Sequence, residues 1–395
     1  MLGKNIFIKI YILISLLCYN KDIYNIINIF IKSIKIDFEI YKIKSFLKFC
    51  SKQNNNVKKF KKRNNPTISI ISPIYNREKR LKRFLKSLQY QNFKDFEIIL
   101  VDDFSKDNSV NVIKEFQQED KRIILIKNRK NKGTFVTRNI GILFSKGKYI
   151  NIPDPDDIFF KDILNNCYMI AKKYNYDIIR FNIFLKNKIW DLEIIDNIEK
   201  RPIYQPKLST YIFYGCKKLR ITDIIIVNKF VKKEVLIRAI NCLNKYYLII
   251  YMTFFEDGLL NYFIHLEGKS LFFLKKIGYI YIKNTESITK NTFKLNTLKF
   301  KLLFFYLKLV FDYSKNTQYC KDVVNSIFNY FIKNNFNILN ILPNSNNNEI
   351  NYFYKGVINK FLHYKFISNE NKIFLQNLKL IFKKKNEILL IKILI

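Results

Sequence analysis

The chain has 395 residues and a formal net charge of +38, with 49% hydrophobic and 16% aromatic residues. This apolar content can fill one large core or two smaller ones, which indicates a globular protein rather than a disordered one. The positive charge would attract nucleotide phosphates, nucleic acid or an anionic membrane face. Nucleic acid is disfavoured as the main partner, because the basic residues are spread along the chain and accompany no recognisable binding module.

Several classes of functional site are disfavoured by what the sequence lacks. The six cysteines form no C-x-x-C pair and have no histidine at ligand spacing, so they predict scattered buried thiols rather than a zinc site or a dense disulfide scaffold. His265 and His363 are the only histidines and stand in no nucleophile or metal constellation. Neither G-x-G-x-x-G nor a G-x-x-x-x-G-K-S/T loop is present, which argues against a dehydrogenase or an ATPase.

Residues 1–50 form an apolar N-terminal segment. Lys4 and Lys9 precede an uncharged apolar run over 10–19, which is too short to span a bilayer but matches the hydrophobic region of a secretory signal. A short anchor, or a helix lying on the folded domain or on a membrane, explains the run equally well. Against secretion, the sequence has no permitted N-x-S/T site. These interpretations predict a membrane-associated protein, in the secretory pathway or at the cytoplasmic membrane face.

Residues 51–66 are rich in Lys and Asn, which predicts a solvated linker. From Thr67, strands alternate with helices in the way that predicts a sheet with crossover helices. The expected strands are 68–72, 96–101, 123–126, 149–152 and 177–181. The expected helices have apolar spacings at Leu81, Phe84, Leu85 and Leu88, at Val112, Ile113 and Phe116, and at Val136, Ile140, Leu143 and Phe144, followed by one near 162–174. Asn, Lys, Phe and Leu at helical spacing predict a mainly helical extension over 291–395.

Acidic residues cluster after two of the expected strands, where open parallel sheets bind ligands. Asp154, Asp156 and Asp157 lie within four residues and repel one another unless a cation or a basic group compensates. Because hard divalent cations prefer oxygen ligands, a Mg²⁺ or Mn²⁺ ion completed by substrate phosphates and water is expected there. The alternative is an acidic turn, in which Pro155 fixes one backbone angle and the Asp residues cap the next helix.

Five ordered motifs resemble those of the family 2 glycosyltransferases, whose pattern runs P-x-Y-N, V-D-D-x-S-x-D, R-N-x-G, D-x-D-D and E-D. The resemblance covers roughly residues 66–290. The matching segments are Pro73-Ile74-Tyr75-Asn76, Val101-Asp102-Asp103-Phe104-Ser105-Lys106-Asp107, Arg138-Asn139-Ile140-Gly141, Asp154-Pro155-Asp156-Asp157 and Glu256-Asp257.

The resemblance implies an α/β fold of the GT-A type, a mixed sheet with helices on both faces, in a catalytic domain over 67–290. It also implies an inverting glycosyltransferase that moves a hexosyl or N-acetylhexosaminyl unit from a nucleotide diphosphate sugar. UDP is the favoured nucleotide, and the acceptor is a hydroxyl on a glycan, lipid or protein.

The resemblance also implies roles for the residues that would bind the nucleotide. Tyr75, flanked by Pro73 and Asn76, stacks on the base. Asp103 accepts hydrogen bonds from the uracil edge, and Asp102 beside it accepts them from base or ribose, although a simple turn is the alternative for this pair. The family has Gly where this chain has Phe104, a change that alters the turn without removing the carboxylates.

Further implied roles concern the sugar diphosphate and the acceptor. Arg138, followed by Asn139, faces the nucleotide or its phosphates, with a surface ion pair as its alternative. Asp154 contacts the ribose or the metal, and Asp156 is the expected direct metal ligand, with Asp157 as a further candidate. Asp257 is the general base that removes the proton from the acceptor hydroxyl. A single displacement needs only this base, so the paired carboxylates of a glycoside hydrolase are not expected.

Two other functions remain open from the sequence. A metal-dependent nucleotidyltransferase also joins a nucleotide-binding sheet to an acidic metal site, but the R-N-x-G and E-D motifs favour the sugar enzyme. A non-catalytic basic protein that binds membranes or nucleic acid could carry the same fold in a silent form.

Overall fold

The computed structural model describes residues 65–185, 188–189, 202–204, 225–244, 256–282 and 376. The chain divides into two compact units, Met1–Val57 and Lys58–Ile395, and every described residue lies in the second. The predicted N-terminal segment at 1–50 and, apart from a single residue, the predicted extension at 291–395 lie outside the described residues. They stay predictions, as does a membrane location. Within the described part of the chain, no helix combines the length and the apolarity needed to cross a bilayer.

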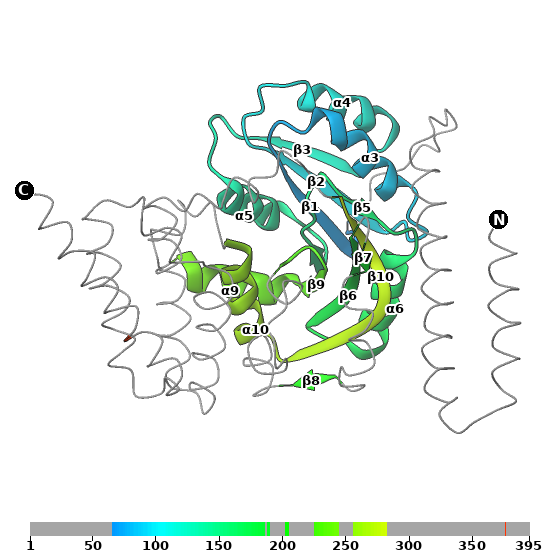
Figure 1. Cartoon of the computed structure of the whole chain (residues 1–395), viewed down its shortest axis with the longest axis vertical. Coiled ribbons are helices and arrows are strands. Elements are labelled where there is room, and N and C mark those ends of the chain that lie inside the picture. The colour runs from blue at the N-terminus through cyan, green and yellow to red at the C-terminus, as the bar shows by residue number, and fades with distance from the viewer. Residues whose placement is uncertain are drawn as a thin grey trace, which may run out of the picture. The chain divides into compact units, whose positions relative to one another are not determined.

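A mixed sheet occupies the centre of the described domain (Figure 1). Its strands are β1 (Ile68–Ile74), β2 (Phe96–Asp102), β3 (Ile123–Lys127), β4 (Tyr149–Asn151), β5 (Ile158–Phe159), β6 (Ile178–Leu185), β7 (Lys188–Ile189), β8 (Ile203–Tyr204), β9 (Lys229–Lys232) and β10 (Ser270–Tyr281). The order is β3-β2-β1-β4-β9-β6-β10-β5, with β7 beside β6 and β8 beside β10. Strands β1 to β4 are parallel, whereas β9 runs antiparallel to β4 and β6. The expected mixed sheet is therefore confirmed.

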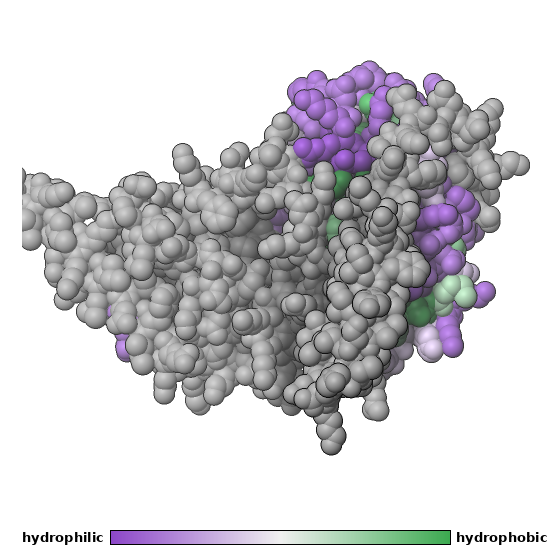
Figure 2. Space-filling view, turned by 45° about the vertical axis from the view of Figure 1, so that its right-hand side comes forward, coloured by the Kyte–Doolittle hydropathy of each residue, from purple (hydrophilic) through white to green (hydrophobic). Residues whose placement is uncertain are grey.

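Helices cover both faces of this sheet. They are α3 (Glu78–Gln89), α4 (Ser109–Glu119), α5 (Thr134–Phe144), α6 (Ile163–Tyr174), α9 (Lys233–Asn244) and α10 (Glu256–Glu267). Helix α5 packs on β1, β2 and α9, and α10 packs on α9, whereas α3 contacts β5, α4 contacts β3 and α6 contacts β10. The outer surface of α3 and α4 is mainly hydrophilic (Figure 2, top).

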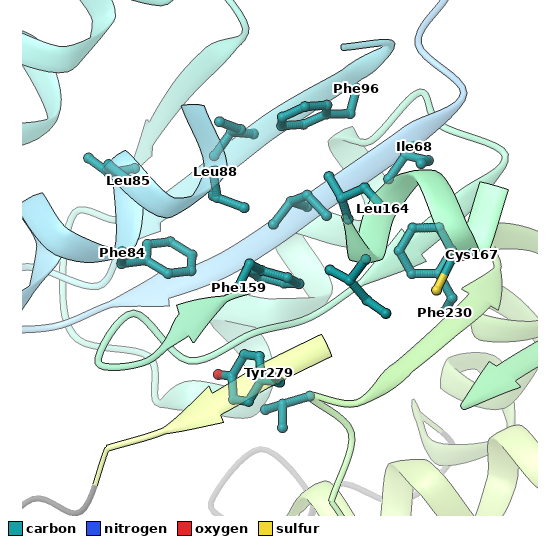
Figure 3. Close-up of a cluster of buried hydrophobic side chains, with 14 of the residues drawn as sticks. Ile68, Phe84, Leu85, Leu88, Phe96, Phe159, Leu164, Cys167, Phe230 and Tyr279 are labelled. Atoms are coloured by element: carbon teal, nitrogen blue, oxygen red, sulfur yellow. The ribbon is translucent and has the colours of Figure 1, made fainter. Parts of the chain in front are cut away.

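The apolar core lies between the sheet and the helices α3, α4 and α6 (Figure 3). Phe84 of α3 packs near Phe159 of β5 with 6.4 Å between ring centroids, and Phe159 meets Tyr279 of β10 edge to face at 5.5 Å. Burying side chains of this size contributes roughly 1.5–3 kcal/mol each. Because Tyr279 is fully buried, this core fixes the position of its hydroxyl group, which reaches the acidic loop after β4.

The expected strands and helices are present over the described residues, but α5 does not bury the apolar residues that predict it. Leu143 and Phe144 are 64% and 65% exposed, and the buried face instead carries Phe135, Arg138 and Gly141. A buried arginine and a glycine occupy this face because it borders the candidate site, so apolar periodicity alone selects the wrong side of the helix.

Candidate active site

The motifs meet at the carboxyl edge of the parallel strands. Ile74 pairs with Asp102 at the ends of β1 and β2, and the amide of Asp103 donates to the Ile74 carbonyl at 2.7 Å. Strand β4 pairs with β1 through Asn151 and delivers the chain to Asp154 from the other side. The sheet thus brings the predicted nucleotide and metal motifs to one edge, as expected for an open parallel sheet.

The acidic loop is anchored on three sides. Ser72 Oγ donates to the Pro153 carbonyl at 3.0 Å, and the amide of Asp154 donates to Tyr279 Oη at 3.0 Å. The amide of Ile282 donates to Asp157 Oδ1 at 2.8 Å. Burial, with the nearby charge of Asp154, raises the pKa of Asp157 well above its usual range. Asp157 therefore ties the loop to the end of β10, and its role as a metal ligand stays a prediction.

Asp156 faces arginines rather than solvent. Its carboxylate lies 2.9 Å from Arg77 Nε and 3.4 Å from Arg80 Nη1, and Arg83 Nη2 donates to its backbone carbonyl at 3.2 Å. These basic side chains compensate the crowded charge that the sequence predicts. None of the five motifs includes these arginines, although their spacing of three residues, which places them on one helix face, is a signal in the sequence.

Arg138 connects the acidic loop to the third acidic cluster. Its Nη2 lies 3.1 Å from Asp154 Oδ1, while Nη1 lies 3.6 Å from Glu256 Oε1 and forms an ion pair with Asp257. Burial alone would lower the pKa of Arg138, but the three carboxylates raise it above its usual range. The side chain is buried, which rules out the alternative of a surface ion pair.

Gly141 sets the depth at which α5 packs on the sheet. A Cβ at this position would overlap Ile71 Cγ2 and lie 3.2 Å from Val101 Cγ2. Only glycine permits this close approach of helix and sheet, and Arg138 lies one turn earlier on the same face. The R-N-x-G motif thus combines a charged group with the glycine that positions it.

Helix α10 begins at the third cluster, which places two carboxylates in the first turn, where the helix dipole favours negative charge. Burial raises the pKa of Glu256 to about 7, with Asp257 adding to the shift and Arg138 opposing it. Burial also raises the pKa of Asp257, and Arg138 again opposes the shift. The side chain of Asp257 remains 24% exposed, so a substrate can reach it. A partly accessible carboxylate with a raised pKa suits a base that works near neutral pH.

The predicted nucleotide-binding residues divide into exposed and buried groups. Tyr75 is 44% exposed beyond the end of β1, and Asn76 Oδ1 accepts from the amide of Lys106 at 2.8 Å. Pro73 lies inside β1, paired with Val101 of β2. Asn139 follows Arg138, and its Oδ1 is buried without a hydrogen-bond partner among the described residues.

The two aspartates after β2 have different surroundings. Asp103 accepts from Asn128 Nδ2 at 2.9 Å, from the amide of Lys132 at 2.8 Å and from the amide of Gly133 at 2.9 Å. It therefore organises the loop that enters α5. Asp102 is also buried, but the bonds from the amide of Ser105 to its oxygens are both 3.4 Å long. Asp102 is thus the carboxylate better placed to accept a further donor, while the base-edge role of Asp103 stays a prediction.

The acidic residues fit a divalent cation held by few protein ligands. Asp154 and Asp156 offer hard oxygen atoms, and the Asp154 side chain is 38% exposed. Across the described ranges, no three Asp, Glu, His or Cys side chains are arranged as a metal cage. One or two carboxylates completed by phosphate oxygens and water agree with this arrangement, as Mg²⁺ commonly binds.

Comparisons with known proteins agree with the fold and the motifs. Residues 69–239 match the family model described as Glycosyl transferase family 2. Glycosyltransferase GlyG of Streptococcus pneumoniae is 33% identical over 117 residues, which cover 30% of this chain and 39% of that protein. Glycosyltransferase GlyA of the same organism is 28% identical over 222 residues, which cover 54% of this chain and 30% of that protein. The chain thus spans less than half the length of these curated relatives.

A solved structure shares the architecture. The crystal structure of S. aureus TarS 1-349 in complex with UDP-GlcNAc superposes with a TM-score of 0.58 at 18% identity, covering 75% of this chain and 80% of that chain. The likeness confirms the fold class expected from the motifs.

Proposed function

We propose that the chain transfers a sugar from a nucleotide diphosphate sugar to an acceptor hydroxyl with inversion, because residues 69–239 match the Glycosyl transferase family 2 model. The transferred group is a hexosyl or N-acetylhexosaminyl unit, and the acceptor lies on a glycan, lipid or protein. A uridine nucleotide is favoured, because TarS, which has a similar fold, was solved with UDP-GlcNAc.

One observation carries the proposal: the guanidinium of Arg138 lies between Asp154 of the acidic loop and Asp257 at the start of α10. In a sugar transfer the donor diphosphate must lie at one end of the reacting bond and the base at the other. A single buried cation that contacts both acidic motifs fixes their separation before substrate arrives, which lowers the cost of orienting the reactants.

The reaction needs one proton transfer and one displacement. Asp257 takes the proton of the acceptor hydroxyl while the acceptor oxygen bonds to the anomeric carbon. The bond between that carbon and the diphosphate oxygen breaks, and the nucleoside diphosphate leaves with the electron pair. Because attack and departure occur on opposite sides of the carbon, the configuration inverts.

The remaining residues bind and orient the donor. Tyr75 stacks on the base, and Asp102 accepts a hydrogen bond from its edge or from the ribose. Asp154 and Asp156 would hold Mn²⁺ or Mg²⁺, which when bound neutralises charge on the departing diphosphate. Asp156 would then share its oxygens between the cation and Arg77. When no cation is bound, the ion pairs of Asp156 with Arg77 and Arg80 hold the acidic loop in place.

A donor screen tests the proposal. Purified full-length chain is incubated with a panel of UDP- and GDP-sugars and Mn²⁺, and the released nucleotide is identified. We expect free UDP from a UDP-sugar, and a rate for Asp156→Ala that falls to the background. Background rates for both the native chain and the variant would contradict transferase activity, and release of a sugar 1-phosphate instead of UDP would favour a nucleotidyltransferase.

A further inference from the structure

Phe104 has a backbone conformation that phenylalanine rarely adopts. Its φ is 69°, and the other described non-glycine residues with positive φ are Asn76 and Asn175. Asparagine tolerates the left-handed region because its short polar side chain can hydrogen-bond locally, whereas a bulky residue there is strained. The motif pattern that this segment resembles has glycine at this position, which would carry no such strain.

The surrounding loop holds Phe104 in this strained conformation. The amide of Asn76 donates to Ser105 Oγ at 3.0 Å, and the amide of Lys106 donates to Asn76 Oδ1 at 2.8 Å. Slightly further along, the amide of Glu78 donates to Asp107 Oδ2 at 3.0 Å. The turn after β1 and the loop after β2 are thus one hydrogen-bonded unit, which keeps Phe104 in place despite the strain.

Burial of the phenyl ring does not offset the backbone strain at Phe104. Phe104 is 40% exposed, and Lys106 Nζ lies 3.5 Å from the centroid of its ring. Tyr75 is similarly exposed at the end of the neighbouring parallel strand, and Asp102 lies two residues before Phe104. Two exposed aromatic residues therefore lie on hydrogen-bonded loops that follow neighbouring strands, close in sequence to the ends of β1 and β2 where Asp102 is proposed to accept from the nucleoside.

We propose that Phe104 is a second aromatic contact for the nucleoside of the donor, beside Tyr75, and that its ring accounts for the retained strain. This inference rests on the proposed function and adds a residue that the family pattern does not supply. Aromatic faces bind any base by stacking, so Phe104 strengthens nucleoside binding without selecting a particular sugar. Lys106 covers part of the ring and places a positive charge next to it.

Binding and stability measured on the same variants test this inference. Phe104→Leu keeps an apolar side chain at the strained position but removes the aromatic face, and Phe104→Gly removes both ring and strain. We expect both variants to bind UDP and uridine about 5- to 50-fold more weakly than the native chain in calorimetric titrations with Mn²⁺ present. We also expect Phe104→Gly to unfold about 2–4 °C higher than the native chain without nucleotide.

Two controls make the outcome specific. Phe104→Tyr keeps the aromatic face and should bind UDP as the native chain does, and Phe144→Leu removes an exposed ring at the end of α5 and should also leave binding unchanged. Unchanged affinity of Phe104→Leu for UDP and uridine would overturn the inference while leaving the proposed function intact. A loss for UDP but not for uridine would also overturn it. A native chain that binds no UDP would overturn both.

Discussion

Arg138 forms an ion pair with Asp257 although 119 residues separate them in the sequence. The same guanidinium reaches Asp154 at 3.1 Å, so one buried cation compensates carboxylates from two motifs. Each of these buried ions needs an oppositely charged partner, because burial removes its hydration and only an ion pair compensates that loss. The candidate site is therefore a single electrostatic unit.

Removing the cation should destabilise the protein in a pH-dependent way. In Arg138→Met the carboxylates of Asp154, Glu256 and Asp257 lose their shared partner, and we expect a loss of about 3–5 kcal/mol in the free energy of unfolding near pH 7.5. At pH 5 the loss should be smaller, because protonation relieves the uncompensated charge. Urea unfolding at both pH values measures this.

Arg238→Met is the matched control for that variant. Arg238 pairs with Glu267 at the other end of α10, but its side chain is 43% exposed, so we expect a change of about 1 kcal/mol or less. Equal losses for Arg138→Met at pH 5 and pH 7.5 would show that packing, and not charge compensation, is the main contribution of Arg138.

Asp257→Asn should separate chemistry from binding. The amide cannot take the proton of the acceptor, so we expect kcat to fall about 10²- to 10⁴-fold while UDP affinity stays within a few fold. Glu267→Gln changes a carboxylate in the last turn of the same helix and should retain full activity. Nucleotide release and calorimetric binding measured side by side check this, and a variant with native kcat would exclude Asp257 as the base.

Much of the fold could be predicted because its signals are local. The short runs of strand-forming residues in β1 and β2, and the spacing of Leu81, Phe84 and Leu88, predict elements that the structure confirms. The motif resemblance identified Arg138 and Asp257 separately. Their direct contact depends on how α10 packs, and no local pattern near residue 256 reports that.

Other features of the site could not be predicted because they depend on packing between distant segments. The hydroxyl of Tyr279 contacts Asp154 across 125 residues, and Asp157 is held by the amide of Ile282. The buried face of α5 could not be predicted from apolar spacing either, because Arg138 and Gly141 lie on that face and interrupt its apolar pattern.

Glu256 should give the stability a distinct pH dependence. Burial raises its pKa from 4.5 to about 7, so between these values the folded chain holds a proton that the unfolded chain has released. The contribution of this group to the free energy of unfolding is therefore fully present below pH 4.5 and is lost as the pH rises toward 7. Glu256→Gln lacks this titration, so its free energy of unfolding should rise relative to that of the native chain over the same window.

Urea unfolding of both proteins at intervals between pH 4.5 and pH 7.5 checks the sign. Both proteins keep the slope that Asp257 contributes, because burial raises that pKa as well. The variant's free energy of unfolding therefore still falls with pH, but less steeply than that of the native chain. Parallel profiles would mean that Glu256 is ionised in the folded chain throughout this range.

Gly141→Ala should weaken the fold and the site together. The new methyl group would overlap the side chain of Ile71 and press on Val101, and relief requires α5 to move outward. Overpacking of this kind typically costs about 1–3 kcal/mol. Because Arg138 lies one turn earlier on α5, the same displacement would lengthen its contact with Asp154, and we expect kcat to fall about tenfold or more. Leu143→Ala alters a 64% exposed position on the same helix and should leave both quantities nearly unchanged. Native activity in a destabilised Gly141→Ala protein would show that the position of α5 and the catalytic geometry are independent.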